Sequence, residues 1–313
     1  MKRLLIILFM IMAQCTLTFC QSGQNNFPVL KGPYMGQKPP GDKPEIFAPG
    51  IVSTIGLEHS KISFSKDGTA FFWAAQPSGK TNIFKQRIWF AKKSGDNWSS
   101  PIELNLPQVA LAAPTLSPDG KELFFTGSEN SSNTNLNQRV KEFFVLNMAD
   151  NKIRNISAEY PMLKECWSFS FADNGDIYFD NSESGRWEIY LLKKQNGKYL
   201  SPQKLSTEIN DRNTNFHPFI SPDSEYLLFA SSRTDGPRNA DLYVSFKDKN
   251  GRWTDAKSLT KACIPNWRER FPSVSADGKY LFFTRRNDDD NDFYWVSAKI
   301  IEELRPAVLK KVK

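Results

Sequence analysis

Few residues in this 313-residue chain carry a thiol or an imidazole: there are four cysteines and two histidines. No Cys/His spacing is typical of a zinc site. The chain also lacks a Gly-x-Ser-x-Gly elbow, a His-Glu-x-x-His pair and a phosphate loop. These absences exclude a zincin, an attached serine peptidase of the elbow type and a P-loop nucleotidase. We expect no metal, no cofactor and no assigned catalytic residue.

Long apolar runs are missing outside the N-terminus, and the mean hydropathy of −0.49 argues against a polytopic membrane protein. The run from Leu4 to Ala13 follows Lys2 and Arg3 and is too short to span a bilayer comfortably. This layout predicts a signal peptide over residues 1–20, cleaved before Gln21. We therefore expect a periplasmic or secreted protein. The alternative is a lipid anchor on Cys20, for which Phe19 is a poor preceding residue.

The excess of positive charge is small when the two ends of the chain are left out of the count. Without Lys2 and Arg3 the net charge of +7 falls to +5, and three of the remaining lysines lie in the C-terminal tail. The sequence pI of 9.1 is thus no argument for nucleic acid, which we do not expect as a partner. After cleavage Cys166 and Cys263 remain, either as an oxidised pair or as two free thiols.

One phrase organises the chain. In residues 113–125 two strands flank Ser117-Pro118-Asp119-Gly120, a turn in which Pro presets φ and Gly accepts a positive φ. This hairpin occurs five times in the chain. Its turn aspartates are 52, 54, 50 and 54 residues apart, and turn chemistry explains them fully: Asp67, Asp119, Asp173, Asp223 and Asp277.

Two further modules follow the hairpins: a short aromatic strand in each repeat, and a pattern such as Trp98-x-x-Pro101-x-x-Leu104 in three of them. A period near 50 residues with four strands per unit predicts an all-β fold, a β-propeller. The fifth repeat lacks its last module, but Ile46–Val52 has that spacing. We therefore predict five four-stranded blades closed by an N-terminal strand, with six blades as the alternative.

The expected organisation is a signal peptide (1–20), an exposed leader (21–43), a single propeller domain (44–305) and a basic tail (306–313). The linked modules over residues 44–300 resemble the TolB-like, WD-repeat-like propeller repeats, above all exported members from Bacteroidetes-type bacteria. The resemblance implies an envelope or extracellular location and a binding role. It does not specify an activity, because one fold hosts many functions.

Function in propellers usually sits where loops meet the central channel, just before each innermost strand. Four of the five repeats carry charged, imidazole or aromatic groups there, and hairpin-exit loops add arginines. The candidate binding residues are Glu58, His59, Glu165, Trp167, His217, Arg233, Glu269, Arg270 and Arg285. Together they would form a mixed pocket that suits an acidic sugar or a peptide carboxylate.

Structural roles compete with this interpretation. His217 could be satisfied by backbone groups at a blade junction, and Glu165, Glu269 and Arg270 could form inter-blade salt bridges. The acidic run at 288–292 is dense in oxygen ligands but lacks a closing Glu, so we expect a solvated loop rather than a calcium site.

Three functions remain open. The first is an exported, monomeric, non-enzymatic propeller that binds a protein or glycan of the envelope through its channel end. The second is a glycan-active hydrolase or lyase that uses the Glu/His/Arg rim. The third is an architectural envelope protein whose basic tail touches an acidic partner. The clear fold signal without a reaction motif favours the first.

Overall fold

The computed structural model describes residues 30–54, 56, 58–76, 86–128, 142–163, 166–233, 240–262, 267–286 and 291–310. The predictions for Cys20, Glu165, Cys263, the acidic residues 288–290 and the end of the tail concern positions outside these residues. Cys166 is buried, and its thiol donates a hydrogen bond to the carbonyl of Ser168 (3.4 Å). Within the described residues, no helix combines the length and the apolarity needed to cross a membrane.

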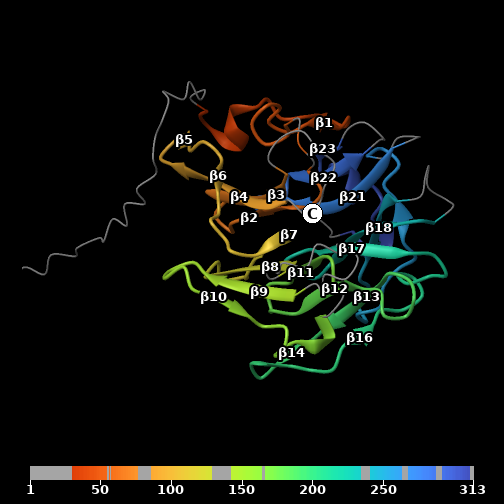
Figure 1. The fold of residues 1–313 in the computed structure, drawn as a ribbon. Helices are drawn as coiled ribbons and strands as arrows, with labels where there is room; N and C mark the ends of the chain where they lie inside the picture. Colours follow the sequence, from red (N-terminus) through yellow and green to blue (C-terminus); the bar gives the residue numbers. More distant parts are fainter. Residues whose placement is uncertain are drawn as a thin grey trace, which may run out of the picture.

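Five antiparallel sheets are arranged in a ring (Figure 1). Blade 1 contains β2 (Ile62–Phe64), β3 (Ala70–Ala75), β4 (Arg87–Ser94) and β6 (Ile102–Glu103), with β5 (Asn97–Trp98) also paired to β4. Blade 2 contains β7 (Val109–Leu116), β8 (Glu122–Ser128), β9 (Glu142–Asn147) and β10 (Ile153–Asn155). Blade 3 contains β11 (Phe169–Phe171), β12 (Ile177–Asn181), β13 (Glu188–Leu192) and β16 (Gln203–Lys204).

Blade 4 contains β17 (Asn215–Ile220), β18 (Tyr226–Ser231), β19 (Asp241–Phe246) and β20 (Lys257–Ser258). Blade 5 contains β21 (Arg268–Val274), β22 (Tyr280–Arg286), β23 (Asn291–Ser297) and β1 (Glu45–Ile46). A small hairpin, β14 (Lys194–Gln195) with β15 (Lys198–Tyr199), extends from blade 3. The short helices are η1 (Pro33–Gly36), η4 (Pro161–Leu163), α1 (Lys299–Glu303) and η5 (Ala307–Leu309).

The prediction of five blades closed by an N-terminal strand is confirmed. Figure 1 shows β1 beside β23, with Glu45 opposite Trp295 and Ile46 opposite Tyr294. The closing strand is shorter than the predicted Ile46–Val52. The chain turns after Phe47 because Ala48 and Gly50 have positive φ values of 43° and 77°.

The repeated turns have the structure that their sequence predicts. The carboxylate of Asp119 accepts hydrogen bonds from the hydroxyl of Ser117 (2.7 Å) and the backbone amide of Lys121 (3.1 Å). Gly120 has a φ of 70°. In blade 4 Ser224 takes the same left-handed conformation, with a φ of 61°. The aspartates of four turns accept such a bond and are structural: Asp67, Asp119, Asp223 and Asp277. The prediction was wrong for Asp173: in blade 3 the side chain of Asn174 accepts the bond from the amide of Asp176 (3.0 Å), and Asp173 instead pairs with Lys66.

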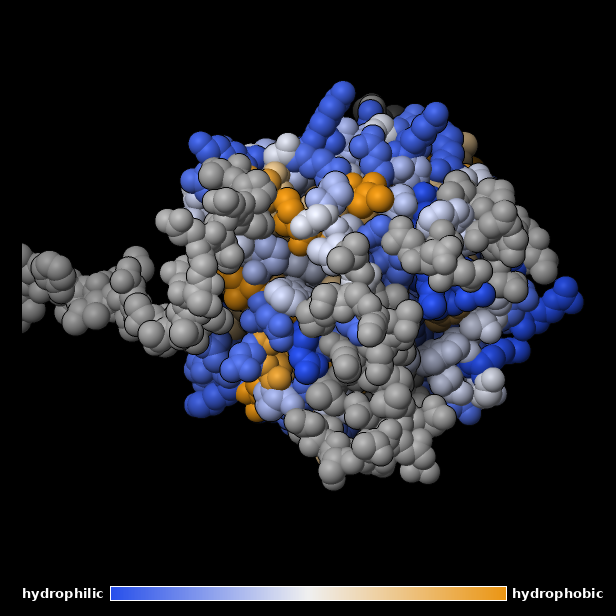
Figure 2. Space-filling view, turned by 45° about the horizontal axis from the view of Figure 1, so that its top comes forward, coloured by the Kyte–Doolittle hydropathy of each residue, from blue (hydrophilic) through white to orange (hydrophobic). Residues whose placement is uncertain are grey.

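The hydrophobic core lies mainly between blades rather than inside one sheet. Five large clusters of buried residues each join two neighbouring blades. At the closing junction Phe47, Phe282 and Trp295 pack with ring centroids 5.0 to 5.7 Å apart. On the face that Figure 2 shows, hydrophobic residues form small separate patches among hydrophilic ones. Each blade thus depends on its neighbours, as the repeat pattern requires.

Candidate functional site

A depression of about 480 Å³ lies at the end of the channel where the innermost strands begin. Its described lining combines aromatic, imidazole and hydroxyl groups with one arginine: His59, Trp167, Trp187, Thr214, Phe216, His217, Ser232 and Arg270. Blades 1, 3, 4 and 5 all contribute. The volume falls within the range of small-molecule sites, about 300 to 1,000 Å³.

Aromatic and imidazole rings form a continuous cluster at this end of the channel. Phe271 lies between the two histidines: its ring centroid is 5.1 Å from that of His59 and 3.6 Å from that of His217. Trp167 contacts His59 edge-on at 5.9 Å, and Phe216 contacts His217 at 4.6 Å. The two histidines, 158 residues apart in the chain, thus share one neighbour.

Local backbone strain shapes the cluster. His217 and Phe271 have φ values of 53° and 52°, and each precedes a proline. At both positions the pairing with the next strand shifts register, between Phe216 and Phe219 in blade 4 and between Arg270 and Ser273 in blade 5. Ala113 in blade 2 has nearly the same φ, 50°, before a proline, so the irregularity belongs to the repeat; at His217 and Phe271 it also sets the positions of large side chains.

In blade 3 a buried carboxylate, that of Asp180, binds the backbone just before the innermost strand. Asp180 accepts hydrogen bonds from the backbone amides of Trp167 (2.7 Å), Ser168 (2.8 Å) and His217 (2.9 Å). The first two amides belong to blade 3 and the third to blade 4. Asp180 therefore fixes the positions of Trp167 and His217 relative to each other.

Arg270 is the only Lys, Arg, Asp or Glu among the described residues that line the depression. Its guanidinium lies over the ring of Phe216, 5.4 Å from the centroid. Burial, with the nearby charges of Arg268 and Arg286, lowers the pKa of Arg270 to about 10. The side chain is therefore still cationic at neutral pH.

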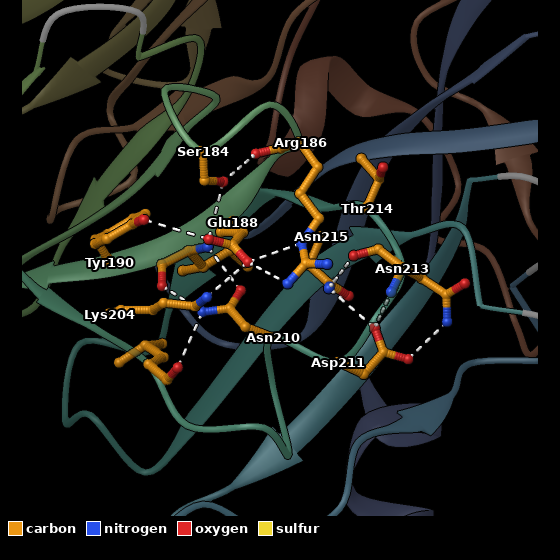
Figure 3. Close-up of polar contacts among 12 residues, drawn as sticks. Ser184, Arg186, Glu188, Tyr190, Lys204, Asn210, Asp211, Asn213, Thr214 and Asn215 are labelled. Carbon is orange, nitrogen blue, oxygen red and sulfur yellow. Dashed lines mark hydrogen bonds and ion pairs between the residues drawn. The ribbon is translucent and has the colours of Figure 1, made fainter.

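A polar network between blades 3 and 4 supports one wall of the depression (Figure 3). Glu188 accepts hydrogen bonds from Arg186 (2.8 Å) and Lys204 (2.7 Å). Burial alone would raise the pKa of Glu188, but these cationic donors and Ser184 lower it to about 2. The network holds the loop that carries Trp187, whose carbonyl accepts a hydrogen bond from the amide of Asn215 (2.9 Å).

The structure brings together four of the residues predicted from sequence: His59, Trp167, His217 and Arg270. Glu58 does not line the depression. It is buried and accepts hydrogen bonds from the amide and hydroxyl of Thr54, both at 3.0 Å. Desolvation raises the pKa of Glu58 to about 8 despite these bonds.

Three other predicted residues make structural contacts. Glu269 and Arg285 form a buried ion pair at 2.9 Å, and Arg285 also donates to the carbonyl of Ala262. Arg233 pairs with Asp211 at 3.5 Å and donates to two backbone carbonyls after β16. Glu165 lies outside the described residues.

Sequence reasoning missed Phe271, Trp187 and Asp180. Phe271 occupies the same position in its repeat as His217, the residue before proline, so a full alignment of the five repeats would have found it. Trp187 precedes the aromatic strand of its repeat. Asp180 stands at the exit of β12, where the other blades carry small or hydroxyl residues. It gives no sequence signal of its own.

Among the described residues no group of three or more His, Cys, Asp or Glu could hold a metal ion. A second cavity, of about 360 Å³, lies at the opposite, turn-bearing end of the channel and includes Lys61 and Phe171 in its lining. An exposed ion pair between Lys66 and Asp173 (3.1 Å) joins turns of blades 1 and 3 at that end.

The ring and its hollowed channel mouth define a five-bladed β-propeller. No protein-family model matches the chain. A curated relative is the Tol-Pal system protein TolB of Francisella tularensis subsp. tularensis (strain WY96-3418), 27% identical over 186 residues. The match covers 58% of this chain and 38% of that protein, so the chain matches well under half of the relative's length.

Two solved structures are among those similar to this chain. A TolB candidate from Agrobacterium tumefaciens superposes with a TM-score of 0.45 and 18% identity, over 78% of this chain and 75% of that one. An alpha-L-arabinofuranosidase from Lactobacillus brevis gives 0.51 and 12%, over 78% and 90%. With its five linked repeats, this chain is a β-propeller that is similar to TolB over 58% of its length.

Proposed function

We propose that this protein is an exported component of the cell envelope that binds a protein or glycan partner through the depression at its channel end, without catalysing a reaction. The observation that carries the proposal is the composition of the described lining: aromatic walls and a charged arginine, with no carboxylate. Such a lining offers stacking surfaces and a cation, but its described residues lack the pair of carboxylates that glycoside hydrolysis normally uses.

A glycan-active hydrolase or lyase is the second candidate, and its fold is compatible, given the likeness to the arabinofuranosidase. Glycoside hydrolysis normally needs two carboxylates about 5 to 9.5 Å apart at the scissile bond. Of the three predicted carboxylates, Glu58 and Glu269 are held by Thr54 and Arg285 away from the described lining. Turnover of a polysaccharide that Glu165→Ala abolishes would establish the enzyme instead.

The envelope location rests on the expected signal peptide and on the TolB-like fold. Cell fractionation with N-terminal sequencing tests it. A mature chain that begins at Gln21 supports simple export, and a lipid-modified chain that begins at Cys20 supports the anchored alternative.

Capture of partners from envelope fractions tests the binding face. We expect Trp167→Ala to reduce capture strongly, because Trp167 lines the depression. Trp253→Ala is the matched control: this tryptophan is also half-buried but lies on the side of blades 3 and 4, away from the channel mouth. Equal capture by both variants would move the binding face elsewhere on the propeller.

A further inference from the structure

We propose that the ligand of the depression is an acidic sugar, a pyranose ring that carries a carboxylate, with Arg270 as the group that binds the carboxylate. The inference deepens the proposed function and rests on it, since it assumes that the depression is the binding face. It follows from the charge balance of the site and from the shape of its walls.

Arg270 is the exception among the arginines that are withdrawn from solvent. Arg233, Arg285 and Arg305 each have side chains no more than 11% exposed, and each is paired with a carboxylate. Nε of Arg270 is buried without a hydrogen-bond partner, and no ion pair joins this side chain to a carboxylate of the described residues. A cation taken out of water without a counter-charge is costly. A bound anion would supply that counter-charge.

The neighbouring residues add to the positive charge. Arg268 and Arg286 face each other directly across β21 and β22, and neither forms an ion pair within the described chain. Like charges in this position destabilise a sheet. They also raise the local potential at the channel mouth, which attracts an anionic ligand and orients it towards Arg270.

The walls indicate a ring-shaped ligand with hydroxyl groups. Trp167 and Trp187 offer two aromatic surfaces around one depression, while the ring of Phe216 lies under the guanidinium of Arg270. Thr214 and Ser232 add hydroxyls. Aromatic faces pack against the C–H faces of a pyranose ring, and the hydroxyls can exchange hydrogen bonds with those of the sugar. A guanidinium binds a carboxylate through two parallel hydrogen bonds. The set fits a sugar acid better than an extended peptide.

The test is titration calorimetry of the mature chain with uronate oligosaccharides: oligogalacturonate, oligoalginate and a glucuronate-containing hexasaccharide, each beside its carboxyl-reduced counterpart. We expect at least one acid to bind and its reduced form to bind about 10- to 100-fold more weakly, since a charge-assisted hydrogen bond is lost. Binding should also weaken as salt is added. Equal binding of an acid and its reduced form would overturn the inference.

Variants locate the contact. Arg270→Gln should weaken binding of the acid to the level of the reduced sugar, while leaving binding of the reduced sugar unchanged. Arg154→Gln is the matched control, because Arg154 is exposed on β10 far from the channel mouth. If Arg270→Gln does not fold, Arg270→Lys keeps the charge and should retain salt-dependent but weaker binding, because the two-pronged geometry is lost. Wild-type affinity in either Arg270 variant would refute the assignment.

Two results separate this inference from the proposed function. If no uronate probe binds but envelope capture still depends on Trp167, the sugar assignment fails and the binding face stands. If a peptide with a free C-terminal carboxylate binds and its amide does not, while uronates fail, the ligand is a protein terminus and the sugar assignment is wrong. If neither the capture of envelope partners nor the binding of sugar changes when residues of the depression are replaced, both proposals are wrong.

Discussion

Lys61 crosses the channel, and its burial should make the stability of the ring depend on pH. The side chain is 3% exposed, and Nζ donates a hydrogen bond to the carbonyl of Phe169, from blade 1 to blade 3. Desolvation lowers the pKa of Lys61 from 10.5 to about 7, against weaker opposing effects of Cys166 and Asp180. The neutral amine suits this position, and the ammonium does not.

The magnitude follows from linkage. In the unfolded chain Lys61 stays protonated up to about pH 10.5, whereas in the folded chain it loses its proton near pH 7. Between these values the unfolded state binds more protons, so the free energy of unfolding rises with pH. At about 1.4 kcal/mol per pKa unit, the full penalty below pH 7 is of the order of 5 kcal/mol.

Replacement by methionine should remove the penalty and also the hydrogen bond to Phe169, which costs about 1 to 2 kcal/mol. We therefore expect Lys61→Met to be more stable than the wild type by roughly 3 kcal/mol at pH 6 and slightly less stable near pH 10. Urea denaturation followed by tryptophan fluorescence at several pH values measures the crossover.

Lys66→Met is the control for the Lys61 experiment, since Lys66 is exposed and lies in the adjacent turn. Its stability relative to the wild type should change little with pH. A Lys61→Met variant that is less stable than the wild type at pH 6, or whose difference from the wild type is constant with pH, would refute the reasoning.

The remaining predictions concern three buried groups. Because the pKa of Glu58 is raised to about 8, its contribution to stability should fall as pH rises from 4.5 to 8. Glu58→Gln should flatten the fall in stability between pH 5 and pH 7, below the range in which Lys61 loses its proton, and an unchanged slope in denaturation at these two pH values would contradict the prediction. Asp180→Asn places an amide group against one of three backbone N–H groups. It should lower the free energy of unfolding by about 2 to 3 kcal/mol and shift the fluorescence of Trp167. An unshifted spectrum would argue against a role of Asp180 in positioning Trp167. Phe47→Ala leaves a cavity at the closing junction and should lower the free energy of unfolding in chemical denaturation by about 3 to 5 kcal/mol. A loss under about 1 kcal/mol would mean that the packing of this junction does not determine the stability of the ring.

The fold could be predicted because its local and global signals agree. Each hairpin carries a turn whose residues have one structural explanation, such as Pro118 and Gly120. The fifth repeat lacks its last module, and a segment with that spacing lies near Ile46. Counting the modules therefore predicts that an N-terminal strand closes the ring. The extent of the closing strand was not, because Ala48 gives no sign in the sequence that it adopts a positive φ of 43°.

Only some of the predicted residues line the depression, and the geometry of the strands explains which ones do. Glu269 and Arg270 are adjacent in β21, and consecutive residues of a strand point to opposite faces. Arg270 therefore faces the depression, while Glu269 turns to Arg285. A choice between the two needs the register, which the shift after Arg270 disturbs. Asp180 acts through backbone amides of two blades, and no spacing in the sequence reveals such a contact.

The two-residue strand β1 sets the order in which the molecule can assemble. Its partners, Tyr294 and Trp295, lie about 250 residues further along the chain. Before blade 5 has formed, the segment around Ile46 has no strand to pair with. Once blade 5 has formed, β23 has an open edge until β1 pairs with it. So distant a contact makes closure a late and slow event in folding. The partly assembled ring is thus the stage at which this protein is most prone to aggregate.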